Sequence, residues 1–253
     1  MRELYWLTEA QLDRLRPFFP TSRGQPGVDD RRVLSGIIFI QRNGLMRKPA
    51  PSAHGPPKTL NNRWKRWSRP GVFATITTER AAQAQQTEMG MIDATCLRHP
   101  GRHQVWPSKR RRGRLIGRTK GGLNSELHVL ADAKGRPIRM FLSAGQTSDY
   151  IGARALLSSI RQVRALPEDR GHDADLFRNV LIEMGILPCI PSRSGRKVSI
   201  PHDADLYLYR QRHKIENMFA RIKDWRRIAT RDDRCPILYL SACALAATVI
   251  YWL

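Results

Sequence analysis

The sequence is poor in acidic residues. Its 253 residues include 22 Asp and Glu against 44 Lys and Arg, so the net charge is +22. This excess is typical of a protein that binds a polyanion, with nucleic acid the first choice and an acidic membrane surface the second. Hydrophobic residues make up 41% of the chain, which is enough to bury a core and excludes a disordered basic tail.

Cysteine is scarce as well. The four cysteines, at positions 96, 189, 235 and 243, form no Cys-x-x-Cys pair and no Cys/His spacing of the kind that binds zinc. We therefore expect reduced, mostly buried thiols, as in a cytoplasmic protein. The glycine-rich phosphate-binding motifs of nucleotide-binding proteins are also missing, so the sequence predicts no nucleotide cofactor.

One uncharged hydrophobic run closes the sequence. It covers 17 residues, 237–253. A membrane span needs about 20 apolar residues, so this run predicts a buried helix rather than a membrane anchor. The first residues, 1–15, carry charges throughout and do not form a signal peptide. We expect no membrane partner.

Two regions differ in their pattern. Residues 1–86 predict short helices, because capping signals recur at Thr8 with Gln11, at Asp29 and at Thr59. Residues 87–253 alternate between strand and helix patterns. The sequence thus predicts a small helical domain, 1–86, followed by an α/β domain with a mixed sheet, 87–253.

The second region opens with a β run at 90–97. A hairpin over 125–145 follows, with its turn at Lys134 and Gly135. A long helix is expected over 206–228, before the apolar C-terminal helix.

That long helix carries a polar stripe next to an apolar one. At 100° per residue, the four polar positions fall within about 60° of arc. These positions are Tyr209, Arg212, Glu216 and Lys223, and the apolar neighbours are Ile215, Met218, Phe219 and Ile222. A carboxylate flanked by Arg and Lys at the margin of a core is suited to holding a metal ion near a phosphate. A solvated helix face with ion pairs at helical spacing remains the alternative.

Two further carboxylates stand at unusual places. Asp93 lies within the apolar β run, where a carboxylate is costly unless it is paired or bound to a metal. Asp169 stands at a strand end before a glycine turn. Together with Glu216 they have the composition of a two-magnesium site, although spacing alone does not show that they converge.

At these residues the sequence resembles the DDE transposases of bacterial insertion sequences, of the insertion-sequence-four and -five type. The match runs through the Tyr-x2-Arg-x3-Glu-x6-Lys signature of 209–223, the MIDAT segment of 91–95 and the EDRGHDAD segment of 168–175. Other stretches look family-like too, so the resemblance covers nearly the whole chain. By this resemblance, residues 87–253 would form a ribonuclease-H-like catalytic domain behind a helix-turn-helix-like domain.

The resemblance also implies an activity. Asp93, Asp169 and Glu216 would be catalytic and would bind two Mg²⁺ ions. The enzyme would cut the terminal inverted repeats of its element and join them to target DNA, by phosphodiester hydrolysis and transesterification. It would act on double-stranded DNA as a homo-oligomer, in the bacterial cytoplasm at the nucleoid. Tyr209, Arg212 and Lys223 would support the site.

The sequence departs from the family pattern around the second Asp. Pro167 and Glu168 precede it, and His172 stands where an aromatic residue is usual. A proline disfavours a sheet-paired strand at this place. A decayed transposase that only binds DNA at element ends is therefore the alternative reading. A basic RNA-binding protein would explain the charge but not the carboxylates.

The helix predicted over 59–69 is a candidate DNA-binding element. Its basic residues alternate with two tryptophans, and it follows an earlier helix and a turn. The candidates for DNA contact are Arg63, Lys65 and Arg66. The alternative is an amphipathic core helix with its tryptophans inward and its charges merely solvated.

A second basic stretch spans 98–120. It holds nine Lys and Arg and no acidic residue. Several glycines predict a flexible loop that binds phosphates without sequence preference; a disordered basic loop with no defined partner is the alternative. The candidates for DNA contact are Lys109, Arg110, Arg111, Arg112, Arg114, Arg118 and Lys120.

Overall fold

The structure is a computed structural model. It describes residues 3–21, 29–45, 51–83, 88–99, 113–147, 149–157, 160, 163–197, 200 and 206–253, with backbone alone at 149, 150 and 206. Contacts divide the chain into two compact units, Met1–Arg80 with Arg221–Leu253, and Ala81–Ala220. The break at residue 80 lies close to the predicted boundary at 86. The C-terminal residues, in contrast, belong to the first unit and not to the unit that contains the sheet.

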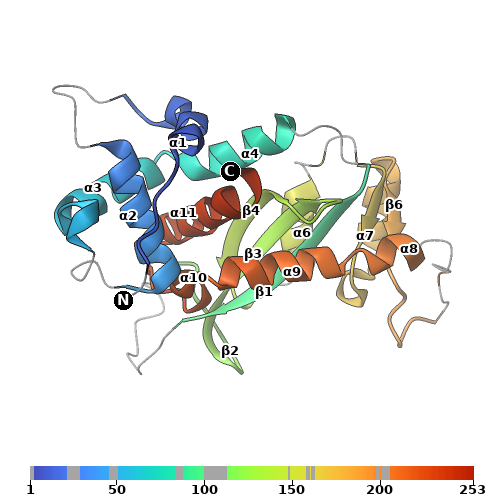
Figure 1. The fold of residues 1–253 in the computed structure, drawn as a ribbon. Helices are drawn as coiled ribbons and strands as arrows, with labels where there is room; N and C mark the ends of the chain where they lie inside the picture. Colours follow the sequence, from blue (N-terminus) through green and yellow to red (C-terminus); the bar gives the residue numbers. More distant parts are fainter. Residues whose placement is uncertain are drawn as a thin grey trace. The chain divides into compact units, whose positions relative to one another are not determined.

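The first unit is helical (Figure 1). Its helices are α1 (Glu9–Leu15), η1 (Arg16–Phe18), α2 (Asp30–Asn43), η2 (Ser52–His54), α3 (Pro57–Ser68), α4 (Val72–Gln83, which runs past the unit's end), α10 (Arg226–Ala229), α11 (Pro236–Ala247) and the π-helical turn η5 (Thr248–Trp252). The capping box of Thr8 with Gln11 and the cap at Asp29 are confirmed. The predicted cap at Thr59 is wrong, because α3 begins two residues earlier at Pro57, where the missing N–H of proline costs nothing.

The core of this unit gathers around α11. Most of its side chains are buried, and the Tyr239 hydroxyl donates to the carbonyl of Ile228 at 2.6 Å. The hydroxyls of Thr77 on α4 and Thr248 lie 3.3 Å apart. The uncharged C-terminal run is therefore a core helix, as predicted. Among the described residues, no helix is long and apolar enough to cross a membrane.

The second unit is built on a mixed sheet. Strand β3 (Gly122–Asp132) pairs antiparallel with β1 (Gly90–Arg98), and along its other edge with β4 (Pro137–Ala144) and the short β2 (Gly117–Thr119). Strands β5 (Ala165–Pro167) and β6 (Leu187–Cys189) pair parallel. A parallel bridge from Met89 to Ala165 continues the order as β4-β3-β1-β5-β6. The predicted mixed α/β sheet is thus confirmed.

The β3–β4 hairpin turns where the sequence predicted. One carboxylate oxygen of Asp132 accepts hydrogen bonds from the backbone N–H groups of Lys134 at 2.9 Å and Arg136 at 2.8 Å. Gly135 adopts a φ of 77°, and a Cβ at this position would lie 2.9 Å from the carbonyl oxygen of Lys214. The turn therefore requires glycine both for its backbone conformation and for the close approach of the chain that carries Arg212.

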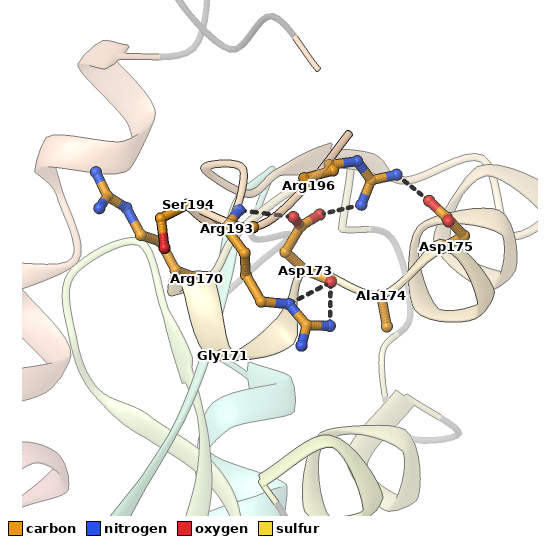
Figure 2. A pocket seen from close by; sticks show the side chains of 9 residues that line it. Arg170, Gly171, Asp173, Ala174, Asp175, Arg193, Ser194 and Arg196 are labelled. Atoms are coloured by element: carbon orange, nitrogen blue, oxygen red, sulfur yellow. Dashed lines mark hydrogen bonds and ion pairs between the residues drawn. The ribbon is translucent and has the colours of Figure 1, made fainter. Parts of the chain in front are cut away.

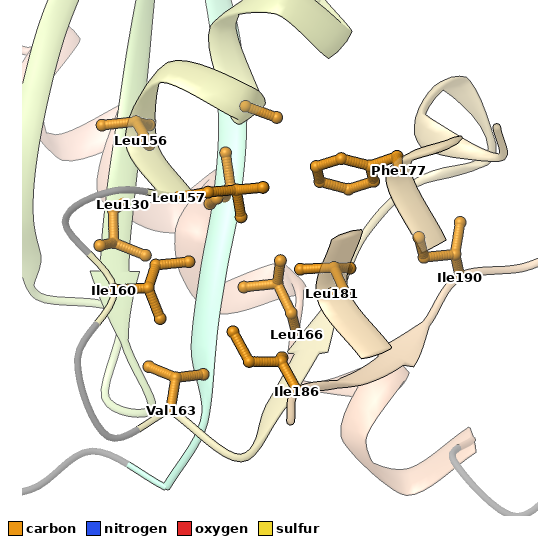
Figure 3. Close-up of a cluster of buried hydrophobic side chains, with 12 residues drawn as sticks. Leu130, Leu156, Leu157, Ile160, Val163, Leu166, Phe177, Leu181, Ile186 and Ile190 are labelled. Carbon is orange, nitrogen blue, oxygen red and sulfur yellow. The ribbon is translucent and has the colours of Figure 1, made fainter. Parts of the chain in front are cut away.

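Helices complete this unit. They are α6 (Asp149–Leu157), the short η3 (Arg170–His172), α7 (Asp175–Glu183), α8 (Leu206–Arg210) and α9 (His213–Lys223, whose last turn enters the first unit). Figure 3 shows the apolar cluster in which Leu156 and Leu157 of α6 meet Leu166 of β5 and Phe177 of α7. This cluster joins the helices to the sheet beside the end of β5.

The prediction of one continuous helix over 206–228 is wrong. The chain divides into α8, α9 and α10, with a turn at 211–212 between the first two. There the backbone N–H of Arg212 donates to the carbonyl of Tyr209, and that of Ile215 to the carbonyl of Arg212, both three residues back. The apolar stripe is buried as predicted. The polar stripe does not stay on one helix face.

We expect Phe177→Ala to destabilise the second unit. Phe177 is 1% exposed, and removing a buried phenyl ring costs about 3–5 kcal/mol of unfolding free energy. The next residue back, Leu176, is 59% exposed, so Leu176→Ala should change the unfolding free energy by less than about 1 kcal/mol. Urea denaturation of the two variants measures this difference. Equal costs would contradict the packing described for α7.

Candidate active site

Strand β1 carries Asp93 at the middle of the sheet. The residue pairs with Val129 of β3, and its side chain is 18% exposed. One carboxylate oxygen accepts the backbone N–H of Ala94 at 2.8 Å, and the other accepts a hydrogen bond from the Arg212 guanidinium at 3.0 Å. Burial raises the pKa of Asp93, while the charge of Arg212 opposes the rise. The sequence prediction of a paired carboxylate at this place is consistent with these contacts.

Glu168 follows β5 and is fully buried. Its Oε1 accepts a hydrogen bond from the backbone N–H of Ile92 at 2.9 Å, which ties the end of β5 to β1 next to Asp93. Burial raises the pKa of Glu168 to about 8, against the opposing charges of His172 and Arg212. The side chain therefore holds its proton at neutral pH.

Asp169 caps η3 and is the more open of the two neighbouring acids, with 43% of its side chain exposed. Its Oδ1 accepts the backbone N–H of Gly171 at 2.8 Å and lies 2.9 Å from Nδ1 of His172. The hydrogen bond from His172 lowers the pKa of Asp169 to about 2, so this carboxylate is ionised. His172 is buried, and its Nδ1 also lies 3.2 Å from Oε2 of Glu168.

Arg212 is the cation of this cluster. Burial acts to lower the pKa of its guanidinium, but Asp93, Glu168 and Asp169 outweigh that effect and raise it. Its position depends on the turn at 211–212, because a continuous helix would have kept it on one face with Glu216. Asp93, Asp169 and Arg212 thus come from distant parts of the sequence and lie in one cluster. All three are among the site residues named from the sequence.

The other predicted site residues lie differently. Glu216 is exposed in the first turn of α9, and its carboxylate forms no hydrogen bond or ion pair among the described residues. Tyr209 is half-buried on α8 and contributes to the electrostatics of Arg212. Lys223 ends α9 and belongs to the first compact unit. The structure therefore does not bring Glu216 into the cluster of Asp93 and Asp169.

The cluster around Arg212 has the donor chemistry of a metal site. The oxygens of Asp93 and Asp169 are the hard donors that Mg²⁺ prefers, and the two carboxylates lie close enough to act on one another electrostatically. In the part of the chain that the structure describes, no group of three or more His, Cys, Asp or Glu side chains is placed to hold a metal ion. The donor chemistry fits, with two of the three predicted ligands together.

The departures from the family pattern have a structural role. Pro167 of β5 pairs with Cys189 of β6, and the N–H of Glu168 donates to the carbonyl of Cys189 at 3.3 Å. The expectation that the proline disfavours a paired strand is therefore wrong. A proline is tolerated because β5 needs no N–H from that position for its pairing with β6. The hydrogen bond from Ile92 to Glu168 joins residues far apart in the sequence, so no local pattern predicts it.

The basic helix α3 has two faces. Trp64 and Trp67 are buried. Arg63 forms an ion pair with Asp30 at 2.9 Å and stacks its guanidinium 5.7 Å from the ring centroid of Trp67, so it is committed to the interior of its unit. Lys65 is half-buried, and the exposed Arg66 donates to the carbonyl of Thr21 at 2.9 Å.

The turns next to α3 bear on the helix-turn-helix prediction. Residues 44–56 separate α2 from α3, and this segment is far longer than the tight turn of a helix-turn-helix. Only residues 69–71 separate α3 from α4.

In the basic stretch of 98–120, Arg118 and Lys120 are exposed and Arg114 is half-buried. Lys109, Arg110, Arg111 and Arg112 lie outside the described residues.

Carboxylates on the adjoining strands β1 and β5 can hold the divalent metal ions that many enzymes use on phosphodiesters. Two family models match the sequence. Residues 7–77 match a putative transposase of the IS4/5 family, and residues 84–234 match a transposase DDE domain. The second match alone covers more than half of the chain.

Two relatives are similar in sequence. The chain is 32% identical over 133 residues to a putative transposase for insertion sequence element IS6501 of Brucella ovis, covering 51% of this chain and 98% of the relative. It is 27% identical over 158 residues to a putative transposase for IS402 of Burkholderia cepacia, covering 55% and 72%. The chain belongs to the DDE transposases of IS4/5-type insertion sequences, a family of metal-dependent DNA-transfer enzymes.

A solved structure of piggyBac transposase in a synaptic complex with hairpin DNA is also similar. The identity is 9% and the TM-score 0.46, with 97% of this chain and 72% of that chain covered. A TM-score this low carries no conclusion about this chain.

Glu168 should make stability depend on pH. Between about 4.5 and about 8 the unfolded chain loses the Glu168 proton while the folded chain keeps it, so the folded state loses stability as the pH rises. Glu168→Gln does not titrate. We therefore expect the melting temperature of the variant, relative to wild type, to increase with pH across this range.

Thermal unfolding in the presence of a metal chelator, repeated at several pH values, measures the difference in melting temperature between Glu168→Gln and wild type. Glu88→Gln is the control, because it replaces a carboxylate of the same unit whose side chain is 78% exposed. A pH-independent difference between Glu168→Gln and wild type would show that Glu168 is ionised when folded.

Proposed function

We propose that this protein is an active transposase that cuts the terminal inverted repeats of its insertion element and joins them to target DNA. The observation that carries the proposal is the cluster around Arg212. It unites Asp93 from β1 with Asp169 from the end of β5, which are 76 residues apart in the sequence. An exposed, ionised Asp169 beside a buried guanidinium is suited to phosphate chemistry.

Mg²⁺ is the proposed cofactor, with two ions per site. Asp93 and Asp169 would hold the metal, and Glu216 would be the third ligand, supported by its exposed carboxylate without protein partners among the described residues. When bound, the metal supplies an activated oxygen nucleophile and stabilises the leaving oxygen. Glu168 stays protonated and supports Asp93 by anchoring the backbone of Ile92.

The remaining site residues act by charge and position. Arg212 balances the carboxylates while no phosphate is near, and its guanidinium is suited to contacting a phosphate oxygen as well. His172 keeps Asp169 ionised and oriented. Tyr209 and Lys223 are proposed as supporting residues on the strength of the family signature.

We assign DNA binding to the helical region of 1–86 and to the basic stretch, and catalysis to the region 87–253, whose sheet-containing part, up to Ala220, has a ribonuclease-H-like fold. The strand order β4-β3-β1-β5-β6, with three antiparallel strands followed by parallel ones, supports that fold. Double-stranded DNA is the partner, a homo-oligomer brings two element ends together, and the site of action is the bacterial cytoplasm at the nucleoid.

A decayed transposase that only binds element ends is the second candidate. It is favoured by one observation, the position of Glu216 outside the acidic cluster. Such a protein would bind the repeats tightly and leave them uncut.

Removing each proposed ligand should abolish cleavage. We expect Asp93→Asn, Asp169→Asn and Glu216→Gln each to slow Mg²⁺-dependent cleavage of a duplex carrying the flanking inverted repeats by more than about 100-fold, because metal ligation supplies several kcal/mol of transition-state stabilisation. Binding of the duplex should persist. The matched control is Glu183→Gln, an exposed carboxylate of the same unit on α7.

The pattern of activities distinguishes the two candidates. Full activity in Glu216→Gln would remove that residue from the site. Tight, specific binding by the wild type without any cleavage would establish the decayed protein.

The exposed end of the basic stretch should contribute to non-specific binding. We expect Arg118→Ala with Lys120→Ala to weaken duplex binding and to reduce the slope of log affinity against log salt by about 2, since each lost phosphate contact changes it by about 0.9. Lys134→Ala with Arg139→Ala removes two exposed charges from the β3–β4 hairpin as a control. Equal slopes in the two double variants would exclude the stretch from the DNA interface.

A further inference from the structure

A cavity of about 780 Å³ adjoins the candidate active site. It lies within the second unit, between η3, the start of α7 and the loop that follows β6. Figure 2 shows Arg170 and Ser194 at one end of it and Arg196 with Asp175 at the other.

Asp173 organises the cavity. Its side chain is 1% exposed and accepts hydrogen bonds from Arg178 at 2.8 Å and Arg196 at 2.7 Å, and from the backbone N–H of Arg193 at 2.8 Å. A second carboxylate, Asp175, pairs with Arg196. A buried carboxylate with this many donors fixes the loop of 193–196 against η3.

Two arginines of the lining keep their charge uncompensated. The guanidinium of Arg193 donates from Nε, at 2.8 Å, and from Nη2 to the backbone carbonyl of Asp173, which is a neutral group. The side chain of Arg170 is exposed and forms no hydrogen bond or ion pair among the described residues. Arg193 is thus oriented by contacts that leave its positive charge free to attract an anion, and Arg170 adds a second such charge.

The position of the cavity indicates which anion it takes. Arg170 directly follows Asp169, the exposed acid of the candidate active site. Along one DNA strand, successive nucleotides rise by about 3.4 Å, so a strand that reaches Asp169 carries its neighbouring phosphates past Arg170. Preorganised guanidinium groups are the side chains that recognise phosphate best.

We propose that this cavity binds backbone phosphates of a DNA strand next to the phosphate that reacts. Arg170 and Arg193 contact the phosphates, and Asp173 and Arg196 are positioning residues that hold the loop in place. The proposal deepens the transposase function proposed above and rests on it for the identity of the strand.

Binding without cleavage tests the cavity separately from catalysis. The probe is a fluorescein-labelled duplex, measured by anisotropy against the full chain in a metal chelator at several salt concentrations. We expect Arg170→Ala with Arg193→Ala to weaken binding about 3- to 10-fold and to reduce the salt slope by about 2, as for two lost phosphate contacts. The single variant Arg170→Ala should reduce it by about 1.

The matched control is Arg154→Ala with Arg164→Ala, which removes two exposed charges from the same unit away from the cavity. Arg193→Lys tests the role of orientation, because it keeps the charge and should retain most of the slope. Circular dichroism melting verifies that each variant is folded, and Arg170→Ala removes no side-chain hydrogen bond or ion pair among the described residues.

The outcomes are distinct. A slope change in the cavity variants that exceeds the control supports the proposal, whether or not the wild type cuts DNA. Slopes equal to the control overturn it, even if the wild type is an active transposase. Stabilisation by inorganic phosphate that is lost in the double variant, without any change in the DNA slope, also overturns the assignment to DNA.

Discussion

Three carboxyl groups and one guanidinium share a largely buried site, and the stability of this site requires that their charges balance. Asp93, Glu168 and Asp169 all act on Arg212, and no two of these residues come from the same segment except the neighbours in sequence. Burial would make three ionised acids prohibitively costly. The site resolves this by keeping Glu168 protonated, pairing Asp93 with Arg212 and leaving Asp169 toward solvent.

This balance explains local features of the backbone. The turn between α8 and α9 lets Arg212 reach Asp93, where a straight helix would not. The hydrogen bond from the N–H of Ile92 to Glu168 joins β1 to the end of β5 at the same point. Asp169 and Asp173 cap the two ends of η3. Asp169 belongs to the acidic cluster, and Asp173 lines the cavity with its arginines.

Local patterns predicted much of the fold. Caps at Thr8 and Asp29, the β run around Asp93 and the hairpin turn at Gly135 depend on residues near in sequence, and the structure confirms them. The break before Arg212 was missed because helical periodicity continues through it, and only a long-range ion pair reveals its cause. The role of Glu168 was missed for the same reason, since its partner Ile92 is 76 residues away.

We propose that Asp93 and Asp169 form a metal site that Glu216 completes. Fe²⁺ substituted for Mg²⁺ and activated with ascorbate and peroxide cleaves a polypeptide next to the bound ion, and mass spectrometry identifies the cuts. We expect cuts in the full chain near residues 93, 169 and 216, suppressed by excess Mg²⁺ and absent in Asp93→Asn. Cuts near 93 and 169 but not 216 would remove Glu216 from the site, and the absence of cuts at both acids would show that Asp93 and Asp169 bind no metal ion.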